Sequence, residues 1–235
     1  MTIVYAAAPG SASNTLCKNL EIILNCKSTT FNSGSGIGHT ILSIPVIKKI
    51  LKKLKLNFLD KTPLINGHFF PTKYNLGLLN YYYNIQHIII SYRNIYEQLN
   101  YYYKWQKYHL RCPLNFEEDI YFSNKDEFNS ENFDIDLNLL LVLNFYKQWF
   151  YLIQNNKIKN YTLFSYEEIL SLNQNYKKKI NYIFKDLVDI KKIKFDKNIK
   201  VNLYKKEQFE INPRHKKMID EFISFYQEVD FSLII

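Results

Sequence analysis

Short apolar runs alternate along the chain with longer stretches of helical spacing. The runs Ile3 to Ala8 (IVYAAA) and Gln86 to Tyr92 (QHIIISY) are rich in β-branched or small residues and stop at Pro9 and Arg93. This pattern favours buried strands. Two further short strands are predicted at Pro63 to His68 and at Tyr161 to Phe164.

Apolar residues recur at helical spacing between and after these strands. The predicted helices cover the residues up to Leu20, Ile41 to Leu56, the residues from about Ile95, Leu137 to Ile153 and Tyr176 to Ile190, with a helical turn at Glu167 to Leu170. Strands that alternate with helices imply a parallel sheet whose two faces are covered. The expected fold class is α/β with three layers, a central and mostly parallel sheet flanked by helices.

The predicted helix Leu137 to Ile153 is apolar but is interrupted by two asparagines, a lysine and a glutamine. It is typical of a buried helix rather than a membrane span, and we interpret Trp149 as a core residue. No run of about 18 or more apolar residues occurs, and the N-terminus lacks the pattern of a signal peptide. We therefore expect a soluble, cytoplasmic protein without a transmembrane segment.

Composition narrows the class of protein without selecting a partner. The chain has 235 residues, of which 47% are hydrophobic, and this fits one domain spanning residues 1–235. Its net charge of +9 attracts polyanions in general, and we expect no nucleic acid. The cysteines show neither paired nor metal-ligand spacing, so we predict a reducing compartment and no metal site.

Two polar segments interrupt the pattern. Ser28 to His39 contains the string GSGIG, but polar residues precede it where a dinucleotide fingerprint needs a strand, so we interpret it as a flexible loop. Arg111 to Phe133 is irregular and polar as well, and we expect both segments to face an acceptor molecule. The lysines of Ile41 to Leu56 are interpreted as a solvated helix face, with a membrane-surface role as the alternative.

The segment Ile3 to Leu20 carries the strongest functional signal. Its apolar run breaks at a Pro-Gly pair, continues through small hydroxyl residues and then becomes helical. Small residues let backbone N–H groups crowd around an oxyanion, Ser11, Ser13 and Thr15 add hydroxyl donors, and the helix adds the positive end of its dipole. The segment predicts a phosphate or sulfate ligand, with a plain strand-to-helix junction as the alternative. No lysine lies inside the loop, which disfavours an ordinary ATPase or GTPase.

Polar residues directly follow three of the predicted strands. They are the loop 9–15, His68 and Arg93, and the carboxyl ends of parallel strands share one edge of a sheet, so we expect them to converge on one cleft. His68 would act there as a general base, with a strand-capping histidine as the alternative. The planar fork of Arg93 suits phosphate, with an ion pair to Glu97 as the alternative.

Four segments, in order, resemble the cytosolic-type sulfotransferases, a family with a P-loop-like fold. They are PGSASNTL at Pro9 to Leu16, NGHFFPTKYNLGLL at Asn66 to Leu79, IIISYRNIYEQLNYYY at Ile88 to Tyr103, and FYKQWFYLIQNNKIKNYTLFSYEEIL at Phe145 to Leu170. The likeness spans most of the chain up to about Ile190, and its specificity comes from order and spacing. It implies transfer of a sulfuryl group from the donor substrate 3'-phosphoadenosine 5'-phosphosulfate (PAPS) to a hydroxyl or amine, with no metal.

The resemblance also implies roles for single residues. The first segment looks like the family's phosphosulfate loop, which assigns donor contacts to Gly10, Ser11, Ala12, Ser13, Asn14 and Thr15. The second places His68 in the role of the catalytic histidine. In the third, Arg93 takes the arginine position that holds the donor's 3'-phosphate, and Tyr101 stands where a serine is usual. In the fourth, Tyr166 falls on an adenine-contacting tyrosine.

The chain departs from the family pattern in three places. Gly10 occupies the place of a lysine or arginine that stabilises charge on the bridging oxygen, and the candidate substitutes are Lys73, which we assign to catalysis, and Lys18. The contact of the usual serine would come from Tyr101, Tyr102 or Asn100. The C-terminal Arg-Lys-Gly motif of the family is not recognisable, although basic residues are available at Lys205, Lys206 and Arg214.

Other classes of function stay open. A P-loop-like kinase of a small molecule or nucleotide is disfavoured by the missing Gly-Lys-Ser/Thr ending. A catalytically impaired sulfotransferase-like binding protein is another option, as is a nucleic-acid module with tyrosine clusters at Tyr81 to Tyr83 and Tyr101 to Tyr103. Consecutive helical tyrosines point in different directions, so we prefer packing as their role. The acceptor, whether a small molecule, a carbohydrate or a lipid, and the oligomeric state, including a homo-oligomer, are left undetermined.

Overall fold

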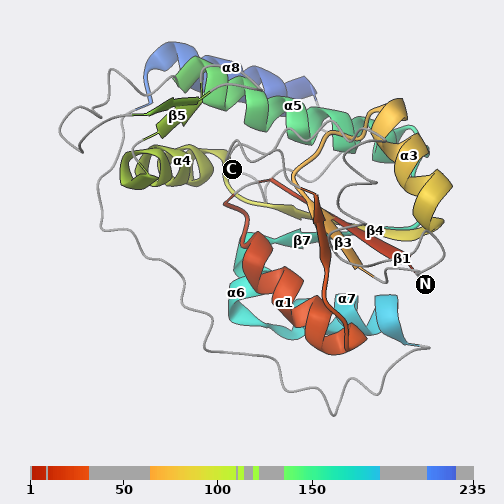
Figure 1. The fold of residues 1–235 in the computed structure, drawn as a ribbon. Helices are drawn as coiled ribbons and strands as arrows, with labels where there is room; N and C mark the ends of the chain where they lie inside the picture. The colour runs from red at the N-terminus through yellow and green to blue at the C-terminus, as the bar shows by residue number, and fades with distance from the viewer. Residues whose placement is uncertain are drawn as a thin grey trace.

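The computed structural model describes residues 2–8, 10–31, 64–109, 111–113, 119–121, 135–185 and 211–225. Several expectations lie outside these ranges, namely the helix at Ile41 to Leu56, the GSGIG string, Pro9, and the lysines Lys205 and Lys206. Within them, strands and helices alternate from β1 (Thr2–Ala7) to α8 (Pro213–Phe225), as Figure 1 shows.

A parallel sheet forms the centre of the fold (Figure 1). In the described part of the chain it has five strands, in the order β2 (Thr29–Phe31), β3 (Leu64–Gly67), β1, β4 (Ile85–Tyr92) and β7 (Tyr161–Ser165). Every neighbouring pair runs parallel, which confirms the predicted sheet and its predicted strands. All residues of β1 are buried, as expected for a central strand covered on both faces.

Helices cover both faces of the sheet and confirm the three-layer prediction (Figure 1). One layer holds α1 (Ser13–Leu24), α6 (Tyr166–Ser171) and α7 (Gln174–Phe184); the other holds α3 (Lys73–Tyr83), α4 (Ile95–His109), α5 (Ile135–Gln154) and α8. The side chains of β1 alternate between the layers: Val4 and Ala6 pack beneath α5, whereas Ile3 and Tyr5 pack against α1. This alternation follows from the period of two residues in a strand.

The predicted buried helix is α5. Trp149 is fully buried in it and donates its indole N–H to the carbonyl oxygen of Phe69 over 3.2 Å, so its interpretation as a core residue is confirmed. Across the described ranges, no helix combines the length and apolar content that a bilayer crossing needs.

Two segments expected to be irregular contain short strands. Thr29 to Phe31, at the start of the expected loop Ser28 to His39, is the edge strand β2 and pairs parallel with β3. Within Arg111 to Phe133, β5 (Arg111–Pro113) and β6 (Asp119–Tyr121) form an antiparallel pair. Strands of three residues are too short to show an apolar alternation, and pairing with a neighbour decides their conformation.

Two helices were absent from the predicted elements. In α3 the Thr72 hydroxyl accepts a hydrogen bond from the Asn75 amide and caps the helix N-terminus. In α8, Pro213 stands at the first position, where a missing N–H is tolerated. The signals at both helices were local capping residues rather than a long apolar stripe.

The sheet sets the position of the candidate site. β1, β3 and β4 are adjacent and parallel, so the residues that follow them lie at one edge. These residues are the loop before α1, His68 and Arg93. Their sequence separation is large, and their common edge is a consequence of parallel pairing.

Candidate functional site

The loop between β1 and α1 turns through two left-handed residues. Gly10 has a φ of 83° and Ala12 a φ of 60°, and the Ser11 amide donates to the carbonyl oxygen of Ala8 over 3.1 Å. Ala12 is the N-cap of α1 and provides no side-chain cap, and the first turn carries no acidic residue. Apart from the Thr15 amide, which donates to the Ala12 carbonyl, the first-turn amides have no intrahelical acceptor, and with the positive end of the helix dipole they form a place that suits an anion.

A buried chain of hydroxyl groups supports this loop from inside the protein. Tyr5 donates to the Ser91 hydroxyl over 2.8 Å, the hydroxyls of Ser91 and Ser11 are 2.7 Å apart, and Ser11 donates to the Ala8 carbonyl over 2.5 Å. Burial raises the pKa of Tyr5, so its hydroxyl stays a donor. In this structure the Ser11 hydroxyl is directed inward, to Ala8, and its donation to a ligand stays a prediction.

The other hydroxyl and amide residues of the loop differ in exposure. Ser13 is half-buried, Asn14 is exposed, and Thr15 is largely buried on the inner side of α1. Thr15 donates its amide to the Ala12 carbonyl over 3.0 Å, as a first-turn residue does. Ser13 and Asn14 are consequently the loop residues whose side chains lie nearest to solvent.

Arg93 joins the loop to two other elements. Its guanidinium donates to the carbonyl oxygen of Gly10 over 3.1 Å and forms an ion pair with Glu97 at 3.1 Å. It also lies over the ring of Tyr166, with the guanidinium carbon 3.9 Å from the ring centroid. The ion pair with Glu97 was the alternative role, and it coexists with the loop contact. Glu97 is exposed, so the ion pair contributes little to stability.

His68 lies at the end of β3 and contacts β1. Its Nδ1 is 2.7 Å from the carbonyl oxygen of Ala7. A carbonyl only accepts, so we assign the proton to Nδ1, which leaves the lone pair on Nε2. Burial lowers the pKa of His68 below its usual range, so the imidazole is neutral at pH 7. The contact with Ala7 is the hydrogen bond expected of a strand-capping histidine, and it leaves Nε2 without a proton.

Three residues were named for the phosphate contact of the family's usual serine. The ring of Tyr101 lies against Gly10. Tyr102 is buried, and its hydroxyl accepts from the Gln98 amide over 3.4 Å, so it faces the core rather than the loop. Asn100 is half-buried, and its Oδ1 has no hydrogen-bond partner in the described part of the chain.

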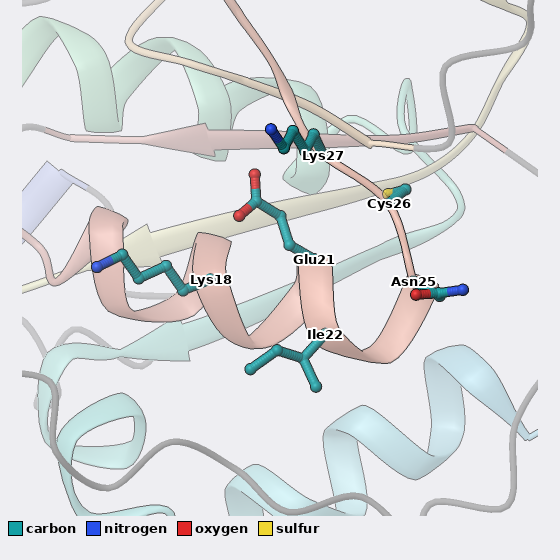
Figure 2. A pocket seen from close by; sticks show the side chains of 6 residues that line it. All are labelled: Lys18, Glu21, Ile22, Asn25, Cys26 and Lys27. Atoms are coloured by element: carbon teal, nitrogen blue, oxygen red, sulfur yellow. The ribbon is translucent and has the colours of Figure 1, made fainter.

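The basic residues named as substitutes lie on different elements. Lys73 is exposed at the start of α3, in the layer opposite α1. Lys18 is exposed on α1, and Figure 2 shows its side chain extending toward the N-terminal end of that helix, where the loop lies. Arg214 is on α8 and pairs with Asp136 of α5 at 3.4 Å. Arg214 is thereby joined to the helical layer rather than to the loop.

Two surface hollows lie away from the loop, His68 and Arg93, although Lys18 lines one of them. Figure 2 shows the first, at the C-terminal half of α1, and it is lined by Lys18, Glu21, Ile22, Asn25, Cys26 and Lys27. The second lies along α5 and is lined by Pro71, Asn144, Lys147, Gln148, Tyr151 and Leu152. Neither of these two hollows is lined by the loop, His68 or Arg93.

The sequence analysis did not identify the buried residues that are hydrogen-bonded to Ser11 and Arg93. Ser91 links Tyr5 to Ser11, and its signal was a hydroxyl at the end of an apolar run. Tyr146 of α5 accepts a hydrogen bond from the Arg93 amide over 3.1 Å and donates to Gln98 over 2.7 Å. Its helical spacing marked it as buried and carried no sign of this contact.

Comparison with known proteins shows which solved structures share this fold. No family model matches the chain, and no curated protein matches it. Among solved structures it is similar to the crystal structure of a mouse sulfotransferase, SULT7A1, complexed with PAP, with 12% identity over 97% of this chain and 85% of that chain and a TM-score of 0.52. At this identity the likeness shows the fold alone. The chain has the sulfotransferase fold.

Proposed function

We propose that this protein is a sulfotransferase that binds PAPS at the loop before α1 and transfers its sulfuryl group to a hydroxyl or amine. The contact between Arg93 and Gly10 carries the proposal, because it brings a cation to an anion-binding loop at the carboxyl edge of the sheet. The fold supports it, since the similar mouse sulfotransferase is complexed with PAP.

In this proposal the donor occupies the loop residues 10–15. The uncapped start of α1 offers amides and a positive dipole to the phosphosulfate, and Ser13 and Thr15 are proposed as hydroxyl donors. The remaining N–H groups of Arg93, beyond those used for Gly10 and Glu97, are proposed to hold the 3'-phosphate. Tyr166 is proposed to contact the adenine, and Tyr101 to border the phosphate.

The chemical step is an in-line displacement at sulfur. The acceptor oxygen or nitrogen forms a bond to sulfur while the bond from sulfur to the bridging phosphate oxygen breaks, and adenosine 3',5'-bisphosphate (PAP) leaves. His68 takes the acceptor's proton at Nε2, because Ala7 holds the opposite nitrogen. Its lowered pKa keeps it in the neutral form that can accept a proton.

Negative charge develops on the bridging oxygen as the bond to sulfur breaks, and a cation near the loop stabilises it. Lys73 and Lys18 are the proposed sources. The direction of the Lys18 side chain along α1 favours Lys18 (Figure 2). We further propose that residues 1–235 form one domain of a cytoplasmic enzyme, and that its acceptor is a small molecule, a carbohydrate or a lipid.

Calorimetric titration with PAP, with AMP and ATP as controls, tests the donor site. We expect PAP to bind at least about tenfold more tightly than AMP, since a phosphate bonded to arginine contributes on the order of 1.5–3 kcal/mol. Tighter binding of ATP than of PAP would favour the kinase class. Binding of none of the three would remove the proposed donor site.

A nucleotide-binding protein without transfer activity is the second candidate function, favoured by the absence of a side-chain cation at Gly10. Incubation with PAPS labelled in its sulfuryl group, together with a panel of alcohols, amines, sugars and lipids, separates the two. Labelled product supports the transferase. Tight binding of PAP without labelled product on any acceptor supports the second candidate.

A further inference from the structure

We infer that Gly10 and Tyr101 form a matched pair, in which the tyrosine ring fills the volume that a side chain at position 10 would need. A Cβ built on Gly10 would lie 2.5 Å from Cδ1, 3.0 Å from Cε1 and 3.0 Å from Cγ of Tyr101. Real Cβ atoms essentially never approach another atom as closely as the first of these distances. Position 10 therefore excludes every side chain while the ring stays in place.

Turning the Tyr101 ring about its own axis relieves only part of the overlap. Such a turn moves Cδ1, but Cγ, at 3.0 Å, is attached to the tyrosine Cβ and stays in tight contact with a Cβ at position 10. The backbone of α4 is anchored on both sides of Tyr101, because Leu99 and Tyr102 are buried in the core. Relief therefore needs a turn of the ring, which moves Cδ1, together with a shift of Cγ by a few tenths of an ångström that the buried neighbours in α4 oppose.

The backbone of Gly10 is held in place as well. Its φ of 83° is a conformation that favours glycine, and its carbonyl oxygen accepts a hydrogen bond from Arg93 over 3.1 Å. On the inner side, the Ser11 hydroxyl donates to Ala8. The loop is thus fixed by Tyr101 outside and by Ser11 inside, and it is built without a side chain at position 10.

This pairing gives one explanation for two unusual residues. The resemblance implies a cation at the position of Gly10 and a serine at the position of Tyr101. Because the ring occupies the space beside Gly10, a lysine at position 10 is compatible only with a small residue at position 101. The role of the pair in the donor loop rests on the proposed function. The packing of Tyr101 against Gly10 does not depend on whether a donor binds.

A double-mutant cycle on the ligand-free protein tests the pair. Gly10→Ala is expected to lower the midpoint of thermal unfolding by roughly 4–12 °C in the wild-type background, from backbone strain and overpacking together. In the Tyr101→Ser background, the same substitution is expected to lower the midpoint by roughly half as much, because only the strain is left. Tyr101→Phe keeps the ring, so Gly10→Ala should retain its full effect in that background.

Equal losses from Gly10→Ala in the Tyr101 and Tyr101→Ser backgrounds would overturn the pairing. If Gly10→Ala unfolds the wild-type protein but leaves a folded protein with Tyr101→Ser, the pairing is supported. If it unfolds both, strain at position 10 outweighs the ring and the pairing is overturned. All of these measurements omit ligand, so a protein that fails to bind PAP would contradict the proposed function and leave the result of the cycle standing.

Discussion

The guanidinium of Arg93 donates a hydrogen bond over 3.1 Å to the carbonyl oxygen of Gly10, which lies 83 positions earlier in the chain. The contact forms because β1 and β4 are neighbouring parallel strands, so the residues after them meet at one edge of the sheet. The centroid of the Tyr166 ring, at the start of α6, lies 3.9 Å from the guanidinium carbon. One cation thereby joins the loop, the end of β4 and the start of α6, and the proposed donor site is organised around it.

Replacing Arg93 tests its proposed contact with the 3'-phosphate. Arg93→Ala is expected to weaken PAP binding by about 10- to 100-fold, because a hydrogen bond to a charged group contributes about 1.5–3 kcal/mol. AMP lacks the 3'-phosphate and should lose much less affinity. Calorimetry on both ligands gives the comparison, and equal losses would argue against the 3'-phosphate role. Glu97→Gln is the matched control, since it removes the exposed ion-pair partner and should not weaken PAP binding.

His68→Ala is expected to abolish sulfuryl transfer while PAP binding persists. The reason is that the proposed proton acceptor, Nε2, is lost, whereas the loop and Arg93 are left in place. His87→Ala is the control. His87 is also half-buried, but it lies near the start of β4, away from the candidate site, and its Nε2 is hydrogen-bonded to the Thr162 hydroxyl. Turnover by labelled donor and binding by calorimetry are measured on both variants. Transfer that survives in His68→Ala would remove this residue from the mechanism.

The lowered pKa of His68 predicts how transfer and stability depend on pH. Burial favours the neutral ring, so turnover should rise with pH, and the midpoint of this rise should lie below the usual histidine pKa of about 6.5. The unfolded chain takes up protons below about pH 6.5 that folded His68 and His87 resist. The free energy of unfolding should therefore fall as the pH drops through about 6.5, and the contribution of these two histidines should be constant only well above it. Urea unfolding from pH 5 to 8 measures this, and a stability that rises on acidification would contradict it.

Lys18→Ala is expected to reduce turnover more than Lys73→Ala. The side chain of Lys18 extends toward the N-terminal end of α1 (Figure 2), whereas Lys73 begins a helix in the opposite layer. A loss of charge stabilisation of about 1.4–3 kcal/mol corresponds to roughly a 10- to 150-fold drop in rate. Single-turnover rates with labelled PAPS compare the two variants. A larger loss of rate in Lys73→Ala would indicate that Lys73, at the start of α3, supplies the catalytic cation.

Ser91→Ala is expected to destabilise the protein by about 1–3 kcal/mol. It leaves the buried hydroxyl of Tyr5 without its acceptor and removes the neighbour of Ser11. Tyr5→Phe combined with Ser91→Ala removes donor and acceptor together and should cost less than the sum of the single changes. Ser171→Ala, an exposed serine that donates to Glu167, is the control and should change stability by less than about 0.5 kcal/mol. Urea unfolding of Ser91→Ala, Tyr5→Phe, the double variant and Ser171→Ala measures these changes in the free energy of unfolding. Strictly additive losses in the double variant would contradict an interaction between the hydroxyls of Tyr5 and Ser91.

The apolar pattern was sufficient for the long elements of the fold. β4 and α5 match their predicted positions within a few residues, because a buried run and a helical stripe are properties of the chain itself. The short strands β2, β5 and β6 were missed, since three residues carry too little pattern and depend on a neighbouring strand. The helix α3 was missed for another reason, because its start is marked by the Thr72 cap and its apolar residues are mixed with polar ones.

Sequence alone determined that the loop, His68 and Arg93 share one edge of the sheet, because parallel strands end together and each of these residues follows a strand. Only the tertiary structure decided what each side chain contacts there. It turned Ser11 inward onto Ala8, set the Nδ1 of His68 on Ala7, and placed the Tyr101 ring on Gly10. These contacts depend on side-chain direction and on partners far along the chain, and no periodicity in the sequence encodes either.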